Sequence, residues 1–417
     1  MNNNQCHMVP QTVFIIIITI LVFNFVLERV LEYVNSRRFQ NELPDEIKDV
    51  YDQERYKKSQ EYKKENYRFS IITSTFSFLL VLGMFLFNGF AFADAIARNI
   101  SSHIILVTLL FFGILMFVFD LITTPFSLYD TFVIEEKFGF NKTTVKTFIL
   151  DKLKGWLLSA IIGGGLLAVI VWFYLKTTVY FWLYAWALIG TFSIFMSMFY
   201  SNLIVPLFNK QTPLEEGDLR EKILEFSQKA GFKLKNIYVI DGSKRSTKAN
   251  AYFTGLGSKK RIVLFDTLIQ DLEKNEIVAV LAHEIGHYKK RHTVTGLVIS
   301  IIQTGVILYI LSLLIGNPVL SAALGTSQPS FHIGMIAFGV LYSPISTILG
   351  LGMNVISRKH EYQADRYAGD RYEPESLIEA LKKLSRKNLI NLTPHPVYVF
   401  FHYSHPPLLQ RIRALMK

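Results

Sequence analysis

The chain has 417 residues, of which 51% are hydrophobic and only 18% are charged, and its mean hydropathy is +0.30. This composition excludes an intrinsically disordered protein and is too apolar for an ordinary soluble one. The single cysteine, Cys6, excludes an internal disulfide and a thiolate zinc finger, so a metal site would have to use His, Asp or Glu. The formal net charge is +11, but the long apolar runs indicate a lipid bilayer as its partner, and we expect no nucleic-acid partner.

Seven apolar stretches are long enough to cross a hydrocarbon core of about 30 Å, which requires a helix of about 20 residues. The first has no preceding Lys or Arg and no following cleavage site of small residues, so we interpret it as a retained span and not as a signal peptide. The fourth and fifth are separated only by residues 176–179 and should form an antiparallel hairpin. The seven predicted spans are residues 8–27, 71–93, 104–122, 156–175, 180–199, 293–314 and 333–356.

Lysine and arginine are distributed unevenly over the connections between these spans. The first connection is rich in them, whereas the second contains only Arg98 and the connection between the sixth and seventh spans contains none. Because Lys and Arg concentrate in loops that stay in the cytoplasm, this alternation predicts an N-terminus outside and a C-terminus inside. The two large polar segments, 201–292 and 357–417, then share the cytoplasmic face, where their positive charge lies beside anionic lipid.

The polar segment between the fifth and sixth spans is expected to form a small α+β unit. Residues 219–230 have the pattern of an amphipathic helix, and residues 237–240 that of a short strand. Residues 251–265 are expected to form a hairpin that turns at 255–260. Residues 275–289 should form a helix that continues through the basic residues after it towards the sixth span.

The predicted fold is therefore an all-α polytopic membrane protein with seven transmembrane helices and a small cytoplasmic α+β domain. Its four parts are the first five spans with their loops in residues 1–205, the α+β segment in 206–292, spans six and seven in 293–356, and a C-terminal cytoplasmic segment in 357–417.

The sequence His-Glu-Ile-Gly-His occupies residues 283–287, on the last helix of the α+β segment. Side chains four residues apart share one face of a helix, so His283 and His287 can converge on one metal ion. Between them, Glu284 can reach a water molecule bound to that ion, which is the pattern of zinc hydrolases. A catalytic zinc usually takes three protein ligands and keeps one position open, so a third ligand is required.

The stretch just after the seventh predicted span offers carboxylates for this third position. Glu361 and Asp365 share one helical face, and Glu361 could bind zinc while Asp365 orients a ligating histidine from behind. The alternative is a solvated helix with ordinary surface charges, which these two residues by themselves favour. His292 and His360 lie close to the motifs in sequence but point elsewhere, and we expect them to be solvated and not to bind metal.

Three motifs follow one another along the chain: HEIGH at 283–287, EYQAD at 361–365 and YSHPP at 403–407. Together they resemble the type I CAAX prenyl proteases, which are seven-span zinc endopeptidases of membranes. Several motifs in one order are more specific than a single motif, and the resemblance covers most of the chain. The other stretches that are similar to this family are residues 135–142, 206–210, 242–246, 250–253 and 261–268.

The resemblance implies a zinc centre with a general base. Its ligands would be His283, His287 and Glu361, which would hold one Zn2+ per chain. Zinc would polarise the scissile carbonyl, and Glu284 would take the proton of the attacking water and pass it to the leaving amine. The α+β domain would then be of the gluzincin type, with Asp365 as the partner that orients a ligating histidine.

The resemblance also assigns roles to residues that the local pattern leaves in turns. It implies that His405 stabilises the oxyanion of the tetrahedral intermediate and that Arg411 supports the substrate or that intermediate. It implies that Asn250 begins a strand that pairs with the backbone of an extended peptide substrate. Without the resemblance, His405 is a turn histidine before two prolines and Asn250 is an ordinary turn residue. No chemical role follows for Glu135 or Glu136.

The predicted function is that of an integral-membrane zinc metalloendopeptidase acting on peptide or protein substrates. The expected reaction removes the C-terminal tripeptide of prenylated CAAX substrates, and the alternative is a membrane-protein quality-control protease without a lipid requirement. A catalytically silent scaffold or transporter would have no reason to retain the base and the ligands together. The expected location is the endoplasmic reticulum or a bacterial inner membrane, with the catalytic face towards the cytoplasm.

Overall fold

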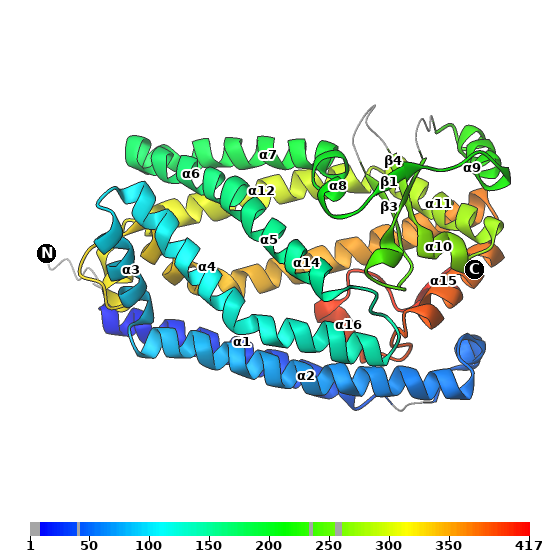
Figure 1. Ribbon diagram of the computed structural model, residues 1–417, viewed down its shortest axis with the longest axis horizontal. Helices are drawn as coiled ribbons and strands as arrows, with labels where there is room; N and C mark the ends of the chain where they lie inside the picture. The colour runs from blue at the N-terminus through cyan, green and yellow to red at the C-terminus, as the bar shows by residue number, and fades with distance from the viewer. Residues whose placement is uncertain (1–8, 40–41, 233–236, 255–260) are drawn as a thin grey trace, which may run out of the picture.

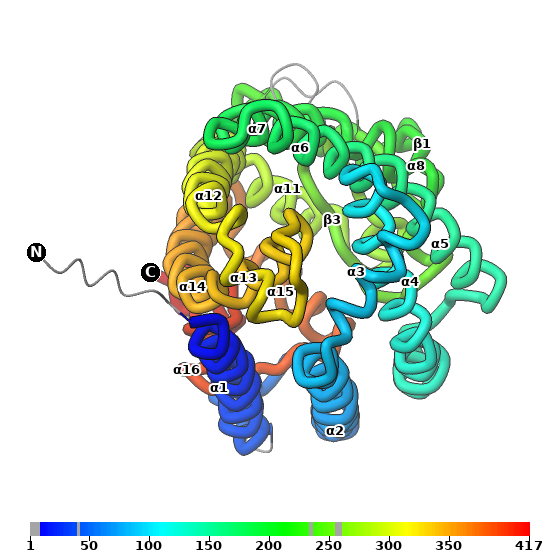
Figure 2. Tube along the Cα trace, turned by 90° about the vertical axis from the view of Figure 1, so that its left-hand side faces the viewer, coloured from blue at the N-terminus to red at the C-terminus, as the bar shows by residue number. Residues whose placement is uncertain are grey.

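Long helices run side by side through most of the molecule, and a small sheet with several shorter helices covers one end of them (Figure 1). Seen from the opposite end, the long helices are arranged in a ring (Figure 2). Cys6, Met8 at the start of the first predicted span, and the predicted turn at 255–260 lie outside the described residues. The structure, a computed structural model, describes residues 9–39, 42–232, 237–254 and 261–417.

Six helical segments in these described ranges are long and apolar enough to cross a membrane. One of them, Val145–Phe208, contains both the fourth and the fifth predicted spans. Within it, Thr178 has a positive φ of 44°, and the helices on its two sides contact each other. The other five segments are Pro10–Ser36, Gln53–Leu86, Ile104–Glu135, His292–Leu314 and Phe331–Arg371.

The helices of the long bundle are α1 (Pro10–Ser36), α2 (Gln53–Leu86), α3 (Gly89–Ile100), α4 (Ile104–Tyr129), α5 (Val145–Leu158), α6 (Gly164–Thr177), α7 (Phe181–Leu203), α8 (Val205–Phe208), α12 (His292–Leu314), α13 (Pro318–Ala323) and α14 (Phe331–Arg371). The helices at the sheet end are α9 (Asp218–Lys229), α10 (Asp266–Asp271), α11 (Lys274–Lys289), α15 (Pro374–Lys387), α16 (Pro396–His402) and α17 (Leu408–Leu415). Short π-helical turns at Asp130–Glu135 and Ser159–Gly163 continue α4 and join α5 to α6.

Two helix boundaries differ from the predictions. The second predicted span, 71–93, is divided, because α2 ends at Leu86 and Asn88 adopts a left-handed conformation with a φ of 53° before α3 begins. The helix expected to continue into the sixth span ends at Lys289, and Arg291, with a φ of 60°, separates α11 from α12. The Asn-Gly pair at 88–89 is a turn signal that the surrounding apolar residues mask, whereas Arg291 carries no such signal.

The sheet has four short strands in the order β1-β2-β4-β3. The predicted strand at 237–240 is confirmed as β2, and the predicted hairpin is confirmed as the antiparallel pair β3 and β4, in which Ala251 lies opposite Leu264. β2 and β4 are parallel neighbours, and β1 was not predicted. Because β3 pairs only with β4, it is an edge strand of the sheet. The strands are β1 (Gln211–Pro213), β2 (Ile237–Ile240), β3 (Ala251–Thr254) and β4 (Arg261–Phe265).

The hydrophobic core at the sheet end fixes the position of α11. Ile277, Leu281 and Ile285 recur every four residues on one face of this helix and are at most 1% exposed. They share one buried cluster with Ile262 and Leu264 of the central strand β4. Burial of each such side chain contributes about 1.5–3 kcal/mol to stability. This face anchors α11 to the sheet, and another side of the helix contacts α14.

A buried polar cluster joins helices at the other end of the bundle, where α3 lies (Figure 1). His332, at the start of α14, is 1% exposed, and its Nε2 lies 2.7 Å from Oδ1 of Asp94 on α3. The Arg98 side chain donates from Nε to the same carboxylate at 2.9 Å, and His332 Nδ1 lies 3.3 Å from the Thr108 hydroxyl on α4. Both ring nitrogens of this histidine therefore have a partner from another helix.

Candidate metal centre

The HEIGH motif lies in the last turns of α11, where this helix packs closely against α14. The helix begins with a capping box, in which Glu273 and Glu276 satisfy backbone amides of its first turn. Further along, a Cβ added to Gly286 would lie 3.1 Å from both the Cα and the carbonyl oxygen of Ala364. The two backbones are therefore in direct contact at this point, and Glu361, one helical turn before Ala364, is brought beside the motif.

Three predicted ligand residues come together between these two helices. The Nε2 atoms of His283 and His287 lie 3.1 Å apart. One oxygen of Glu361 lies 3.2 Å from Nε2 of His287, and the other lies 3.5 Å from Nε2 of His283. One ligand atom from each of the three residues can be chosen so that all lie within 4.8 Å of one another. Side chains 78 residues apart in sequence therefore converge on one point.

The carboxylate of Glu361 supports the interpretation of this point as a metal site. The residue is 4% exposed, yet its Oε2 atom receives no hydrogen bond from any described residue. Burying a carboxylate oxygen without a partner is costly, and a cation removes that cost. Two imidazole nitrogens and one carboxylate oxygen are also the donor set of many catalytic zinc sites. The residues present therefore fit a zinc ion.

Asp365 and Arg411 lie beside the Nδ1 edge of His283. Oδ1 of Asp365 lies 2.8 Å from Nδ1 of His283, which leaves Nε2 of that ring for a metal. Arg411 holds the same carboxylate with two hydrogen bonds, at 2.8 Å from Nε and 2.6 Å from Nη2. Although burial opposes its protonation, the hydrogen bonds to Asp365 and Glu361 raise the pKa of His283 to about 9.

His292 is buried, so the prediction that it is solvated was wrong. It is 6% exposed, its Nδ1 lies 3.0 Å from Nδ1 of His287, and its Nε2 lies 2.8 Å from the side-chain oxygen of Gln363. Its ring also stacks on His360, with centroids 3.9 Å apart. The reason is the break at Arg291, which restarts the helix and turns His292 back towards α14. This contact orients the second histidine ligand, and no local pattern in the sequence could have indicated it.

Glu284 and His405 lie beside the three ligands without being part of them. The Glu284 side chain is half-buried, and its carboxylate forms no hydrogen bond or ion pair with the described residues. Nε2 of His405 lies 3.3 Å from Oε1 of Glu361, while 64% of the His405 side chain is exposed. Ser404 is within hydrogen-bonding distance of the other ring nitrogen, at 2.9 Å. The site thus combines a carboxylate free to accept a proton with an accessible imidazole.

The two predicted substrate-binding residues occupy different surroundings. Asn250 is exposed and lies directly before the edge strand β3, where its carbonyl accepts a hydrogen bond from the backbone of Phe265 at 3.1 Å. The Arg411 side chain is only 12% exposed and is committed to Asp365, with Nη1 3.8 Å from Oε2 of Glu361. The roles of both residues in substrate binding stay predictions, and the structure adds a contact of Arg411 with the ligand shell.

Glu135 and Glu136, which have no role predicted from the sequence, bind the segment that leads into β3. Oε2 of Glu135 lies 2.7 Å from Nζ of Lys248, and Tyr62 on α2 donates a hydrogen bond to the same carboxylate. Glu136 accepts a hydrogen bond at 2.9 Å from Asn141, which forms an isolated β-bridge to the chain before Lys248. The turn that follows α4 therefore holds Ser246 and Lys248, in the segment before Asn250, in place. The partners of Glu135, Tyr62 and Lys248, are distant in sequence, so no local signal identified its role.

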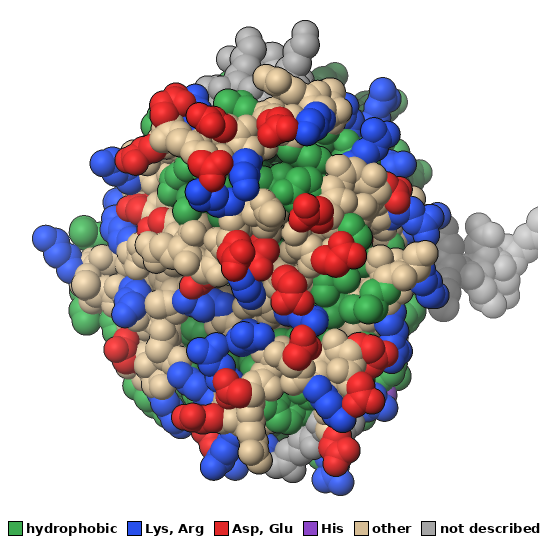
Figure 3. Space-filling view, turned by 90° about the vertical axis from the view of Figure 1, so that its right-hand side faces the viewer, with side chains coloured by type: hydrophobic (Ala, Val, Ile, Leu, Met, Phe, Trp, Pro, Cys, Tyr) green, Lys and Arg blue, Asp and Glu red, His purple; other side chains and the backbone are tan. Residues whose placement is uncertain are grey.

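The end of the molecule that carries the sheet is polar on its outer surface. Figure 3 shows Lys, Arg, Asp and Glu side chains spread over this face, with hydrophobic side chains between them. By contrast, the long helices expose many large apolar side chains, including Ile72, Leu79 and Phe117. The metal centre thus lies at the water-exposed end of a bundle whose flanks are suited to lipid. Fold and site together define a membrane-embedded metallopeptidase.

Comparisons with known proteins identify the family. The description "CAAX prenyl protease N-terminal, five membrane helices" matches residues 32–210, and "Peptidase family M48" matches residues 213–417. The chain is 38% identical over 386 residues to CAAX prenyl protease 1 homolog of Arabidopsis thaliana, covering 89% of this chain and 90% of the relative. It is 35% identical over 413 residues to CAAX prenyl protease 1 of Saccharomyces cerevisiae, covering 92% and 91%.

A solved structure has the same architecture. The crystal structure of Ste24p from S. mikatae matches with a TM-score of 0.90 and 36% sequence identity, over 97% of this chain and 98% of the other. The chain therefore belongs to peptidase family M48 and is a metalloendopeptidase of the membrane.

Proposed function

We propose that this chain is a zinc endopeptidase with seven membrane spans that removes the C-terminal tripeptide of prenylated CAAX substrates on the cytoplasmic side of its membrane. The observation that carries the proposal is the convergence of His283, His287 and Glu361, in which the buried Oε2 of Glu361 receives no hydrogen bond from the described residues. Glu284 directly follows His283 on the same helix. The names of the relatives support the substrate class.

The span count and the orientation rest on separate observations. The break at Thr178 divides residues 145–208 into two helical arms that contact each other, which gives seven spans if each arm crosses the bilayer. The basic connections lie at the same end as the sheet, which supports a cytoplasmic catalytic face. The eukaryotic origin of the relatives quoted above favours the endoplasmic reticulum over a bacterial inner membrane.

The protein's own residues account for the proton transfers. Zinc, when bound, would supply a Lewis acid that polarises the scissile carbonyl and lowers the pKa of a water molecule. Glu284 has no competing partner among the described residues, so it can accept the proton of the attacking water and deliver it to the leaving amine. We assign to the exposed imidazole of His405, whose Nε2 lies 3.3 Å from Oε1 of Glu361, the hydrogen bond to the oxyanion that develops on the carbonyl.

The edge strand β3 accounts for the recognition of an extended peptide. Its outer backbone groups have no strand neighbour in the described sheet, so a substrate can add to it by backbone hydrogen bonds. Asn250, directly before this strand, is exposed and available for the substrate. Asp365 and Arg411 hold His283 in one ring orientation, which keeps its Nε2 directed at the metal position.

The test compares purified wild type with Glu284→Gln on one peptide in farnesylated and unfarnesylated forms, with products identified by mass spectrometry. We expect cleavage three residues from the C-terminus, stronger with the lipid and abolished by Glu284→Gln, while the bound zinc is retained. Cleavage that depends on Glu284 but is indifferent to the lipid would favour a quality-control protease. Unchanged cleavage by Glu284→Gln would overturn the proposed mechanism.

A further inference from the structure

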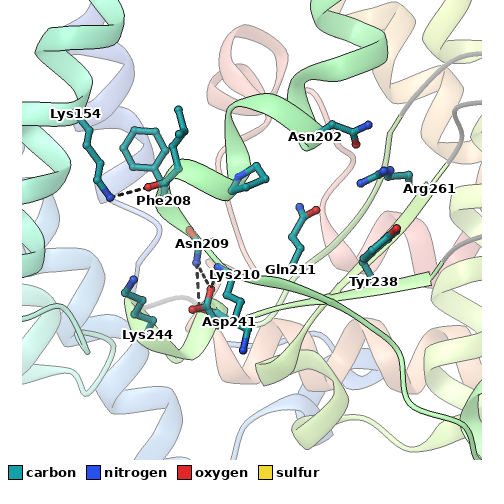
Figure 4. Close-up of a pocket in the computed structure, with 12 residues that line it drawn as sticks. Lys154, Asn202, Phe208, Asn209, Lys210, Gln211, Tyr238, Asp241, Lys244 and Arg261 are labelled. Atoms are coloured by element: carbon teal, nitrogen blue, oxygen red, sulfur yellow. Dashed lines mark hydrogen bonds between the residues drawn. The ribbon is translucent and has the colours of Figure 1, made fainter.

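A cavity that none of the three predicted metal ligands lines is located where the helical segment 145–208 ends and the sheet begins (Figure 4). It has a volume of about 610 Å3 and is open to solvent. The end of α5, the short helix α8, and strands β1, β2 and β4 supply its walls. Four of its side chains are cationic, and we call it the basic pocket: Lys154, Lys210, Lys244 and Arg261.

The positive charge of the basic pocket is only partly balanced by the residues that line it, which include four cations and one carboxylate. Its single acidic residue, Asp241, already accepts hydrogen bonds from the side chain of Asn209 at 2.9 Å and the backbone of Lys210 at 2.8 Å. Within the described part of the chain, Lys210, Lys244 and Arg261 form no salt bridge. Four cations collected in one cavity with a single carboxylate repel one another, and a bound anion would reduce that repulsion.

The other contacts in the basic pocket are with neutral groups. Lys154 donates from Nζ to the carbonyl oxygen of Leu207 at 2.7 Å, as Figure 4 shows beside Phe208. The Arg261 guanidinium lies over the ring of Tyr238, 4.6 Å from its centroid. These contacts hold the two cationic groups in place without neutralising them. The pocket is therefore organised to receive an anion.

Apolar surface next to the basic pocket indicates which kind of anion it takes. On α5, Leu153 and Leu157 flank Lys154 and are 49% and 61% exposed. On the other side, Leu207 lines the pocket and is 46% exposed, and Leu203, at the end of α7, is 49% exposed. All four belong to the segment 145–208, which is apolar enough to lie in a bilayer. A ligand bound here would have its anionic part among the cations and an apolar part along these leucines, which is the chemistry of a phospholipid.

We propose that the basic pocket binds the phosphate-bearing headgroup of an anionic phospholipid, with its acyl chains along the exposed leucines of α5, α7 and α8. The position of the pocket at the end of a membrane-spanning segment is the depth at which headgroups lie. A soluble phosphate compound would use the same cations but would leave the leucines uncovered. None of the residues that line the basic pocket belongs to the proteolytic site. The proposal for the pocket therefore does not depend on which substrate the protease cleaves.

The test uses the full chain in detergent and native mass spectrometry with phosphatidylinositol 4-phosphate, phosphatidylcholine or inositol phosphate as the probe. The variant Lys244→Gln/Arg261→Gln removes two cations of the pocket, and Lys57→Gln/Lys58→Gln removes two exposed cations of α2 as a matched control. We expect the pocket variant to bind the anionic lipid at least about tenfold more weakly and the control to bind it like wild type. Unchanged thermal unfolding of both variants checks that they are folded.

Three results would count against a phospholipid in the basic pocket. Equal loss of binding in both double variants would mean a general effect of net charge and would overturn the proposal. Binding of phosphatidylcholine as strong as that of the anionic lipid would overturn it as well. Inositol phosphate that binds as tightly as the lipid, with the same sensitivity to the pocket variant, would assign the pocket to a soluble anion instead.

Discussion

Two clusters of one histidine, one aspartate and one arginine lie at opposite ends of this molecule, and only one of them fits a metal. In both, the carboxylate lies within 2.8 Å of a ring nitrogen and is also bound by the arginine. At the far end, the second nitrogen of His332 faces the Thr108 hydroxyl, and Phe111 packs against the ring at 4.5 Å. At the sheet end, the second nitrogen of His283 faces another histidine and Glu361.

The difference lies in the group that is left without a partner. All the polar atoms of the His332 ring are satisfied within the protein, so that cluster ties three helices together and needs nothing else. The cluster around His283 has one buried carboxylate oxygen that receives no hydrogen bond from the described residues. The same three types of side chain therefore have a structural role around His332, where the ring nitrogens have hydrogen-bond partners within the protein. Around His283, the additional carboxylate of Glu361 has an oxygen without a hydrogen bond, and the cluster fits a metal.

The largest effect is expected from removing Glu361, because the cluster around His332 has no corresponding carboxylate. Glu361→Ala should abolish both zinc binding and peptide cleavage, because two histidines alone hold zinc weakly. The zinc-to-protein ratio, measured by inductively coupled plasma mass spectrometry, should fall close to zero. Glu375→Ala removes an exposed carboxylate of α15 and is the control that should keep its zinc. Full zinc occupancy in Glu361→Ala would mean that the third ligand is a different residue.

A matched pair of substitutions compares the two clusters directly. Asp365→Asn should weaken zinc binding about 10–100-fold, because the ring of His283 loses the negatively charged acceptor that orients it. Asp94→Asn should leave zinc affinity unchanged but lower the free energy of unfolding by about 1–3 kcal/mol, because buried His332 and Arg98 lose the negatively charged acceptor that they share. Competition with a chelator and thermal unfolding measure the two quantities. Equal effects of both variants on zinc would contradict the distinction.

A smaller effect should separate the two stacked histidines. His292→Phe keeps the ring but removes both nitrogens, one of which contacts His287, so we expect about tenfold weaker zinc binding. His360→Phe keeps the same stack and serves as the control, because the stacking contact with His292 does not require its nitrogens. Zinc affinity that falls equally in both variants would show that packing, and not the hydrogen bond to the ligand, is what matters.

The smallest effect concerns the segment that leads into the edge strand. Glu135→Gln weakens the contact with Lys248, so we expect KM to rise a few-fold while kcat and bound zinc stay close to wild type. Glu65→Gln, which removes a surface partner of Lys137, is the control with no expected effect. A fall in kcat with unchanged KM would assign Glu135 to the catalytic step and would contradict a role in positioning the strand.

Local spacing was enough to predict part of this arrangement. The four-residue separation of His283 and His287 indicated one helical face, and the alternation of β-prone residues indicated β2 and the β3–β4 hairpin. The apolar runs located the candidate spans, but the six segments merge two of them into 145–208. These features depend on residues that are near one another in sequence, so periodicity and composition carry them.

Contacts between distant segments could not be predicted in this way. The burial of His292 depends on a backbone break at Arg291, where a non-glycine residue adopts a positive φ that only tertiary packing maintains. The pairing of Glu135 with Lys248 joins residues 113 positions apart. The excess positive charge of the basic pocket likewise arises only when α5, α8 and three strands are brought together. Packing geometry, not sequence pattern, determines these parts of the protein.

The space between α11 and α14 at Gly286 is too small for a methyl group. Because Gly286 has no side chain, the backbones of α11 and α14 are in contact there. This backbone contact fixes the distance between the two histidines on α11 and the carboxylate of Glu361 on α14. An alanine there would meet Ala364 at 3.1 Å and Tyr367 at 3.2 Å and would have to push the helices apart by some tenths of an ångström. Misplacement of catalytic groups by about 1 Å can lower the rate about 100-fold. The close approach of the two helices at Gly286 is therefore a requirement for the geometry of the site.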